Sequence, residues 1–266
     1  MLQQAVDFRE ESEALFALLD PLGEEDWERK TQFKGWTIND VVAHLHIGNY
    51  AADLSLQDSA AFLDFVRRWT AAGRQGGGHL AFTHVWLGGL KGRALLQRWR
   101  AFYREMADRF LVADPAQRVR WVGPDMSVRS SVTARLMETW AHGQAVYDLL
   151  GRERRESDRI KNIAVLGVNT FGWSFRNRGL AVPGDPPYVR LTAPSGAVWE
   201  WNAPSHTNRV EGSAVEFCQV VTQVRNIADT RLRVMGETAA AWMAIAQCFA
   251  GPPEEPPAPG TRFRQG

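Results

Sequence analysis

Helical periodicity of the apolar residues is the feature that most limits what this chain can fold into. Four long segments show it within the first 150 residues, at 2–20, 37–56, 84–111 and 127–150. Each places apolar side chains three or four positions apart, as one buried face of an α-helix requires. Their connections are short or carry capping residues, which favours antiparallel neighbours. The sequence therefore predicts an N-terminal four-helix bundle.

Two local signals refine this bundle. Thr37 can cap the second helix, because Asp40 follows three positions later and forms an acidic variant of the capping box. A shorter helical pattern covers residues 61–72, and three glycines follow at 76–78. This glycine run lacks the lysine and the preceding strand of a phosphate-binding loop, so we interpret it as a hinge.

The character of the sequence changes at residues 181–187, AVPGDPP, where glycine and prolines cluster. Two alternating segments follow and predict a β-hairpin, and two later helical patterns can cover the small sheet. These four elements are expected at 188–192, 197–201, 213–224 and 238–249. The predicted fold class is α+β, with a metal-binding helical bundle over 1–180. A small α/β domain with a proline-rich C-terminal tail then occupies 181–266.

Charge and composition exclude several classes of function. Lys and Arg total 31 against 30 Asp and Glu, a formal net charge of +1, so no general attraction to nucleic acid or to an anionic membrane is expected. No apolar run approaches the roughly 20 residues of a membrane span, and the start lacks the pattern of a secretory signal. We therefore expect a soluble, cytoplasmic protein. Cys218 and Cys248 are predicted to be buried free thiols.

Glu138 and His142 form a pair with ligand spacing. They are four positions apart in a helical segment, so they project from one face about one turn apart. Ordinary surface pairs share this spacing, so a third ligand decides the interpretation. Either His44 or His46 can supply it, but not both, because two positions turn a helical side chain by roughly 200°. A histidine that joins no such set is a hydrogen-bonded core residue.

Two imidazoles and one carboxylate suit zinc, and also nickel, iron or copper. Three protein ligands leave a coordination position open for water or substrate, which favours chemistry over a structural role. The helices contain enough apolar residues to pack without an ion. Loss of the metal is therefore expected to impair activity more than folding.

Four side chains near these positions have less specific interpretations. Arg135 is close enough to pair with Glu138 or to bind a substrate carboxylate, and a solvated ion pair is the default expectation. Asn49 and Asp53 are turned roughly 140° and 180° away from His44 on an ideal helix, so they can orient a ligand only if the helix bends or ends near Gly48. Trp140 is predicted to belong to the core.

Two segments together resemble a known family. GWTINDVVAHL, from Gly35 to Leu45, and ETWAHGQAVYDLLG, from Glu138 to Gly151, are similar to the N-terminal domain of mycothiol-dependent maleylpyruvate isomerases in the DinB-like superfamily. The resemblance covers about residues 5–155, and DTRLRVMGETAAAWMAIAQCFAG looks like an uncharacterised metal-binding subgroup. It implies a DinB-like bundle in which His44, Glu138 and His142 ligate a divalent metal. His44 is thereby preferred over His46.

The residues and the resemblance together predict a metal-dependent enzyme. It is expected to activate a low-molecular-weight thiol, such as mycothiol, or water, toward a small electrophilic substrate such as an unsaturated acid. Isomerisation or group transfer would follow. A metal-dependent hydrolase and a non-catalytic metal-binding module are the alternatives. The sequence leaves the native metal and a homodimer open.

Overall fold

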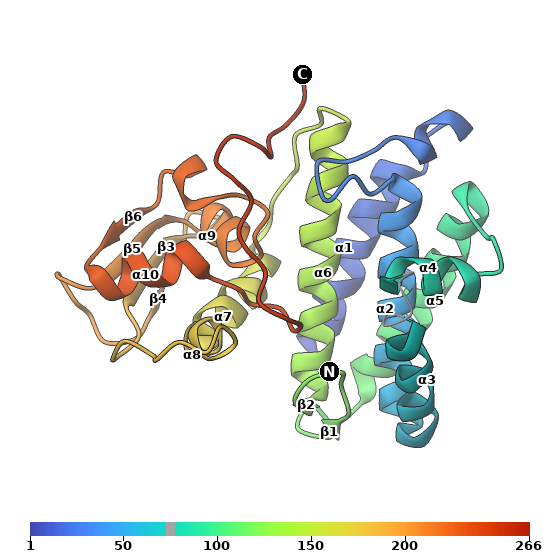
Figure 1. Cartoon of the computed structure of the whole chain (residues 1–266), viewed down its shortest axis with the longest axis horizontal. Coiled ribbons are helices and arrows are strands. Elements are labelled where there is room, and N and C mark those ends of the chain that lie inside the picture. Colours follow the sequence, from blue (N-terminus) through green and yellow to red (C-terminus); the bar gives the residue numbers. More distant parts are fainter. Residues whose placement is uncertain (73–77) are drawn as a thin grey trace. The chain divides into compact units, whose positions relative to one another are not determined.

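The computed structural model describes residues 1–72 and 78–266, so most of the predicted glycine hinge lies outside the described residues. The chain divides into two compact units, Met1–Leu149 and Leu150–Gly266 (Figure 1). The division lies well before the seam expected after residue 180. Residues 181–187, where the seam was expected, instead form a loop inside the second unit.

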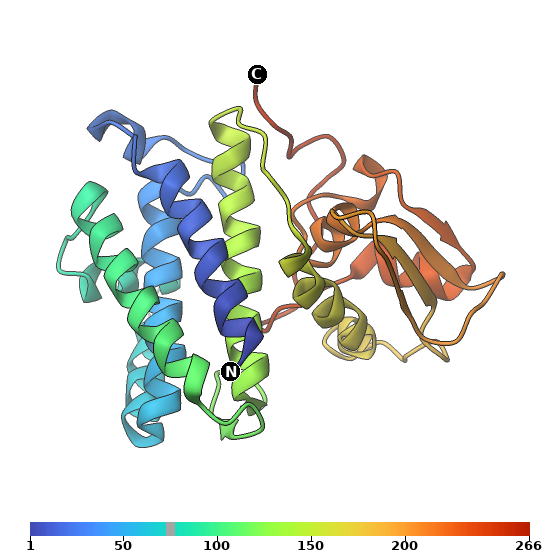
Figure 2. The same ribbon diagram turned by 180° about the vertical axis from the view of Figure 1, so that it is seen from behind.

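The first unit is helical. Four long helices, α1, α2, α5 and α6, pack side by side and form the predicted bundle, as Figures 1 and 2 show from opposite sides. The described residues of this unit also form a 3-10 turn, η1, two shorter helices, α3 and α4, and a two-stranded ribbon before α6. The elements are α1 (Gln3–Leu19), η1 (Glu24–Glu28), α2 (Ile38–Gln57), α3 (Ser59–Ala72), α4 (Gly78–Trp86), α5 (Gly92–Val112), β1 (Arg118–Val119), β2 (Met126–Ser127) and α6 (Val128–Leu149).

The start of α2 is fixed by the predicted capping box. The Thr37 hydroxyl accepts a hydrogen bond from the backbone N–H of Asp40 at 3.1 Å, and the Asp40 carboxylate accepts one from the backbone N–H of Thr37 at 2.8 Å. The second carboxylate oxygen of Asp40 lies 2.8 Å from Nε2 of His84 on α4. The capping box therefore fixes where α2 begins, and with it the position of His44 along the helix.

The single helix predicted over 84–111 is wrong. The structure has two helices there, α4 and α5, separated by residues 87–91. Gly88 and Gly89 have φ values of 61° and 81°, in the left-handed region that ends a helix and that glycine adopts without strain. Apolar residues on both sides of this pair continue the helical spacing, which conceals the break in the sequence.

The second unit contains a four-stranded mixed sheet of order β4-β3-β5-β6. The predicted hairpin is confirmed: β3 (Tyr188–Thr192) pairs antiparallel with β4 (Val198–Trp201). Two further strands, β5 (Arg209–Ser213) and β6 (Arg233–Met235), were not predicted, and β5 runs parallel to β3. The helices of this unit are α7 (Lys161–Asn169), α8 (Phe171–Arg176), α9 (Ala214–Val221) and α10 (Glu237–Ile245).

The packing of α7 explains where the units divide. Gly167 on α7 faces Phe217 and Val221 of α9, and an added Cβ would have no room there. This close approach packs α7 against α9 in the second unit, although residues 161–169 were predicted to belong to the helical bundle. Cys218 and Cys248 of this unit are both buried, as predicted.

Candidate metal centre

Three potential metal ligands converge from two helices of the bundle. His44 comes from α2, whereas Glu138 and His142 come from successive turns of α6. One donor atom of each lies within 4.8 Å of the other two. Over residues 1–72 and 78–266, this is the one group of three or more His, Cys, Asp or Glu side chains that could hold a metal ion. The donors are also the imidazole and carboxylate types that divalent transition metals accept.

A single oxygen of Glu138 lies within hydrogen-bond distance of both histidines. Its Oε2 atom lies 3.0 Å from Nε2 of His44 and 3.1 Å from Nε2 of His142, and the two rings are 4.5 Å apart between centroids. The two nitrogens and the oxygen are therefore directed at one region of space. A small cation in that region would meet all three, so the residues fit such an ion.

The surroundings favour the ligand forms of these side chains. Burial raises the pKa of Glu138, but hydrogen bonds with His142 and His44 and the charge of Arg135 outweigh it, and the pKa falls well below its ordinary value. Burial is also the largest influence on His44 and lowers its pKa, assisted by the nearby His142. An ionised carboxylate and a neutral imidazole are the forms that bind metals.

Two aromatic rings line one side of the histidines. Trp36 stacks on His142, with ring centroids 5.5 Å apart and planes 9° from parallel, and it lies 5.2 Å from the ring of His44. Phe33 meets His142 edge-on at 4.9 Å. The turn between them is tight because Lys34 and Gly35 have positive φ angles of 52° and 68°. This role was not predicted from the sequence, although the Gly35-Trp36 pair stands directly before the Thr37 cap.

The three side chains are partly accessible to solvent. Exposed fractions are 27% for His44, 19% for Glu138 and 11% for His142. An exogenous ligand can therefore reach the position between them. This partial exposure is what a catalytic metal site needs and a closed structural site does not.

Arg135 departs from its predicted solvated state. It is only 5% exposed and lies one turn before Glu138, with Nη2 3.9 Å from Oε1 of that residue. Its guanidinium lies 5.3 Å from the ring centroid of Trp121, and Nη1 occupies the space where a Cβ of residue 48 would stand. Gly48 therefore leaves the room in α2 that lets an arginine approach the ligand set.

His46 lies on another face of α2, among aromatic residues. It is 2% exposed, and its ring lies 5.5 Å from that of Trp86 and 5.3 Å from that of Phe102. Its Nδ1 atom has no hydrogen-bond partner among the described residues. Burial, together with the charge of Arg98, lowers the pKa of His46 to about 4. The structure thus places His46 apart from the three ligand candidates.

The remaining candidates also lie outside the cluster. Asp53 is buried and receives two hydrogen bonds from Arg109, at 2.7 and 2.9 Å. Asn49 is 1% exposed, and neither its side-chain oxygen nor its nitrogen finds a partner in the described part of the chain. Trp140 is fully buried in the bundle, as predicted.

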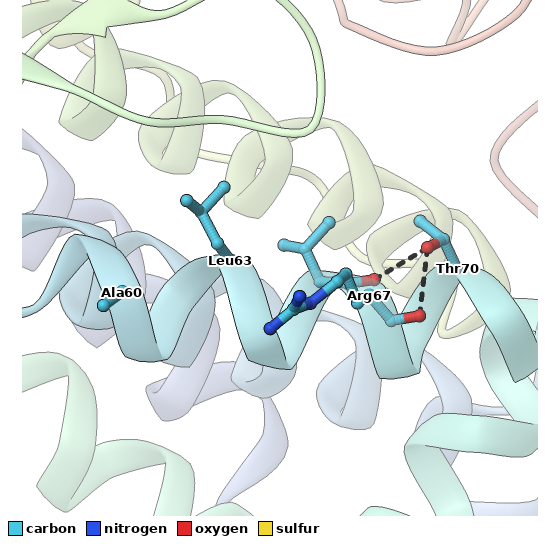
Figure 3. Close-up of a pocket in the computed structure, with 5 residues that line it drawn as sticks. Ala60, Leu63, Arg67 and Thr70 are labelled. Carbon is cyan, nitrogen blue, oxygen red and sulfur yellow. Dashed lines mark hydrogen bonds between the residues drawn. The ribbon is translucent and has the colours of Figure 1, made fainter.

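A surface pocket of about 440 Å³ lies elsewhere, along α3 (Figure 3). The hydroxyl of Thr70 there donates to the carbonyls of Val66 and Arg67 on its own helix. Arg67 pairs with Asp64 at 3.1 Å. The pocket is lined by Ala60, Leu63, Val66, Arg67 and Thr70, none of which is a ligand candidate.

The fold and this cluster define a class of protein: a helical bundle with an inward His-Glu-His group, followed by a small mixed α/β unit. The profile of the mycothiol maleylpyruvate isomerase N-terminal domain matches residues 8–147. The chain belongs to this family. The match covers all three ligand candidates and ends close to the boundary of the first unit.

Individual proteins are also similar to this chain. The chain is 38% identical over 247 residues to Uncharacterized protein MT0041 and to Uncharacterized protein Rv0036c, from two strains of Mycobacterium tuberculosis, covering 93% of this chain and 95% of each relative. The crystal structure of the mycothiol-dependent maleylpyruvate isomerase and that of its mutant each match with a TM-score of 0.53 at 13% identity. Each covers 82% of this chain and 87% of the other. None of the helices in the described residues is long and apolar enough to cross a membrane.

Proposed function

We propose that this protein is a metal-dependent isomerase or transferase that uses a low-molecular-weight thiol. In this proposal His44, Glu138 and His142 hold one divalent cation, with zinc first and nickel, iron or copper as alternatives. The observation that carries it is the convergence of both imidazoles on one oxygen of Glu138, at 3.0 and 3.1 Å.

The chemistry follows from the charge of the ligand set. Two neutral imidazoles and one carboxylate leave a divalent site at a formal charge of +1, which favours one anionic exogenous ligand. A cation at this position would lower the pKa of a bound thiol or water and so supply a nucleophile at neutral pH. The family supports a thiol, because the related solved enzyme is described as mycothiol-dependent.

The protein residues contribute orientation and shielding. Trp36 and Phe33 cover one side of the imidazoles, which restricts how their rings turn and excludes water from that side. The accessible side is left for the thiol and a small electrophilic substrate, such as an unsaturated acid of the maleylpyruvate type. Partial exposure of the donors also favours an enzyme over a non-catalytic metal-binding module.

The chain offers a matched pair of histidines for the test. His44→Ala and His46→Ala each remove one imidazole from the same helix, but only the first removes a proposed ligand. We expect about one equivalent of metal in the wild type and in His46→Ala, and loss of the metal from His44→Ala, measured by elemental analysis of the purified full chain. Equal metal content in all three proteins would overturn the ligand assignment.

Turnover assays then identify the nucleophile. Isomerisation of small unsaturated acids should require both the metal and an added thiol such as mycothiol. Hydrolysis or hydration of a substrate that needs the metal but not the thiol would instead identify the protein as a hydrolase or hydratase.

A further inference from the structure

Arg135 is a buried positive charge beside a group proposed to bind a cation. Its side chain is 6% exposed, and Nη2 stands 3.9 Å from Oε1 of Glu138, on the carboxylate oxygen that does not face the histidines. This separation exceeds a hydrogen bond. Nε of Arg135 has no hydrogen-bond partner among the residues that the structure describes. Glu138 therefore does not satisfy the guanidinium.

The position of this charge is built into the bundle. The absence of a Cβ at Gly48 admits Nη1 on one side, and the Trp121 ring lies 5.3 Å away. The charge consequently stays close to the ligand set while being largely removed from water. Charges in such places interact more strongly than surface charges, because solvent screens them less.

A cation site gains nothing in affinity from a nearby arginine, since like charges repel. The arrangement makes sense if the centre must attract an anion. Counting Arg135 raises the formal charge around a bound divalent ion from +1 to +2. One exogenous anion then leaves the centre still positive, so a second negative group on the same or another ligand is also accommodated.

We propose that Arg135 sets the charge of the metal centre so that it selects anionic exogenous ligands, thiolates and carboxylates, over neutral ones. This inference rests on the proposed function, because it needs the cation at His44, Glu138 and His142. It adds a specificity residue outside the ligand set. It also assigns Gly48 the role of admitting that residue.

The test measures anion binding rather than turnover. Cobalt(II) is loaded into the full-length protein, and azide is titrated while the visible spectrum of the metal is followed. We expect Arg135→Met to bind azide at least about tenfold more weakly, because a nearby unscreened charge is lost. Arg135→Lys, which keeps the charge, should remain within about threefold of the wild type.

Two further variants make the result specific. Arg109→Met removes an arginine paired with the buried Asp53 and should leave azide binding unchanged. Arg135→Gln repeats the neutral substitution with a polar side chain, in case the methionine variant does not fold. Both neutral variants should bind cobalt at least as tightly as the wild type.

Three results would count against the proposal. Unchanged azide affinity in a neutral variant that retains cobalt would overturn it. A cobalt affinity lowered by about 10- to 100-fold would show instead that Arg135 acts by holding Glu138 in place. A wild-type protein that binds no metal at all would remove the proposed function itself, which the histidine pair distinguishes from a failure of Arg135 alone.

Discussion

The two histidines of α2 are two residues apart and have opposite surroundings. His44 faces α6, where a carboxylate oxygen of Glu138 lies 3.0 Å from its ring. His46 faces the rings of Trp86 and Phe102 and leaves Nδ1 without a partner among the described residues. One helix therefore carries one imidazole beside a carboxylate and another among aromatic rings, and burial lowers the pKa of both. The neighbouring helices, rather than the local sequence, determine which histidine can act as a ligand.

The largest effect that can test this contrast is the pH dependence of stability. Burial holds the pKa of His46 at about 4 in the folded protein, against an ordinary value of 6.5. Between these values the unfolded chain binds a proton that the folded chain does not, so stability falls as pH is lowered from 6.5 to 4. We expect His46 alone to account for about 3 kcal/mol of this loss.

His46→Phe isolates this contribution, because phenylalanine fits an aromatic setting and cannot be protonated. Urea unfolding of the metal-free wild type and variant across this pH range supplies the two stability curves. Their difference should grow as pH falls and then level off below about pH 4. Parallel curves would mean that His46 is not held neutral by its surroundings.

A smaller effect is expected from Gly48→Ala, on the His44 side of α2. The new Cβ would overlap Nη1 of Arg135, so the guanidinium must move. Overpacking costs about 1–3 kcal/mol, whereas alanine gains about 1 kcal/mol over glycine in a helix, which leaves a net loss of about 1 kcal/mol. Urea unfolding measures this change.

The matched background for this variant is Arg135→Met. If the cost arises from the guanidinium, Gly48→Ala should destabilise the Arg135→Met protein less than the wild type. Equal costs in both backgrounds would place the crowding elsewhere.

The smallest effect concerns the aromatic cover of each histidine. Trp36→Leu removes the ring stacked on His142, a contact of about 0.5–1.5 kcal/mol, and should weaken zinc binding by about two- to tenfold in a chelator competition. Trp86→Leu removes a comparable ring contact from His46 and should leave zinc affinity unchanged. Equal effects of the two variants would remove the distinction between the two faces.

The parts of this site that lie within one helix could be predicted from the sequence. Glu138 and His142 share a face because of their spacing, and Thr37 with Asp40 marked the start of α2. The choice of His44 over His46 needed the family resemblance, because spacing along a helix does not identify the neighbouring helix. The solvated state expected for Arg135 is wrong for a similar reason. Its burial depends on Gly48 in a different helix.

The errors in the fold also have physical causes. Gly88 and Gly89 divide a helix whose apolar spacing continues across them. Strand β5 has a single apolar residue, Val210, and contains Gly212, and β6 has only three residues, so neither shows a clear alternation. The cluster of glycine and prolines over 181–187 predicted a linker or domain seam, whereas these residues form a loop within the second unit. Which elements pack together depends instead on contacts such as that of Gly167 with α9.

The ligand candidates are far apart along the chain, since His44 and Glu138 are separated by 94 positions. An ion held by both would act as a removable cross-link that closes this long segment into a loop. Because the two ligand helices come together only on folding, such an ion stabilises the folded state by mass action and leaves the unfolded chain unconstrained. Occupancy of the centre would thus report that α2 and α6 have docked, which makes ion capture a late event during folding.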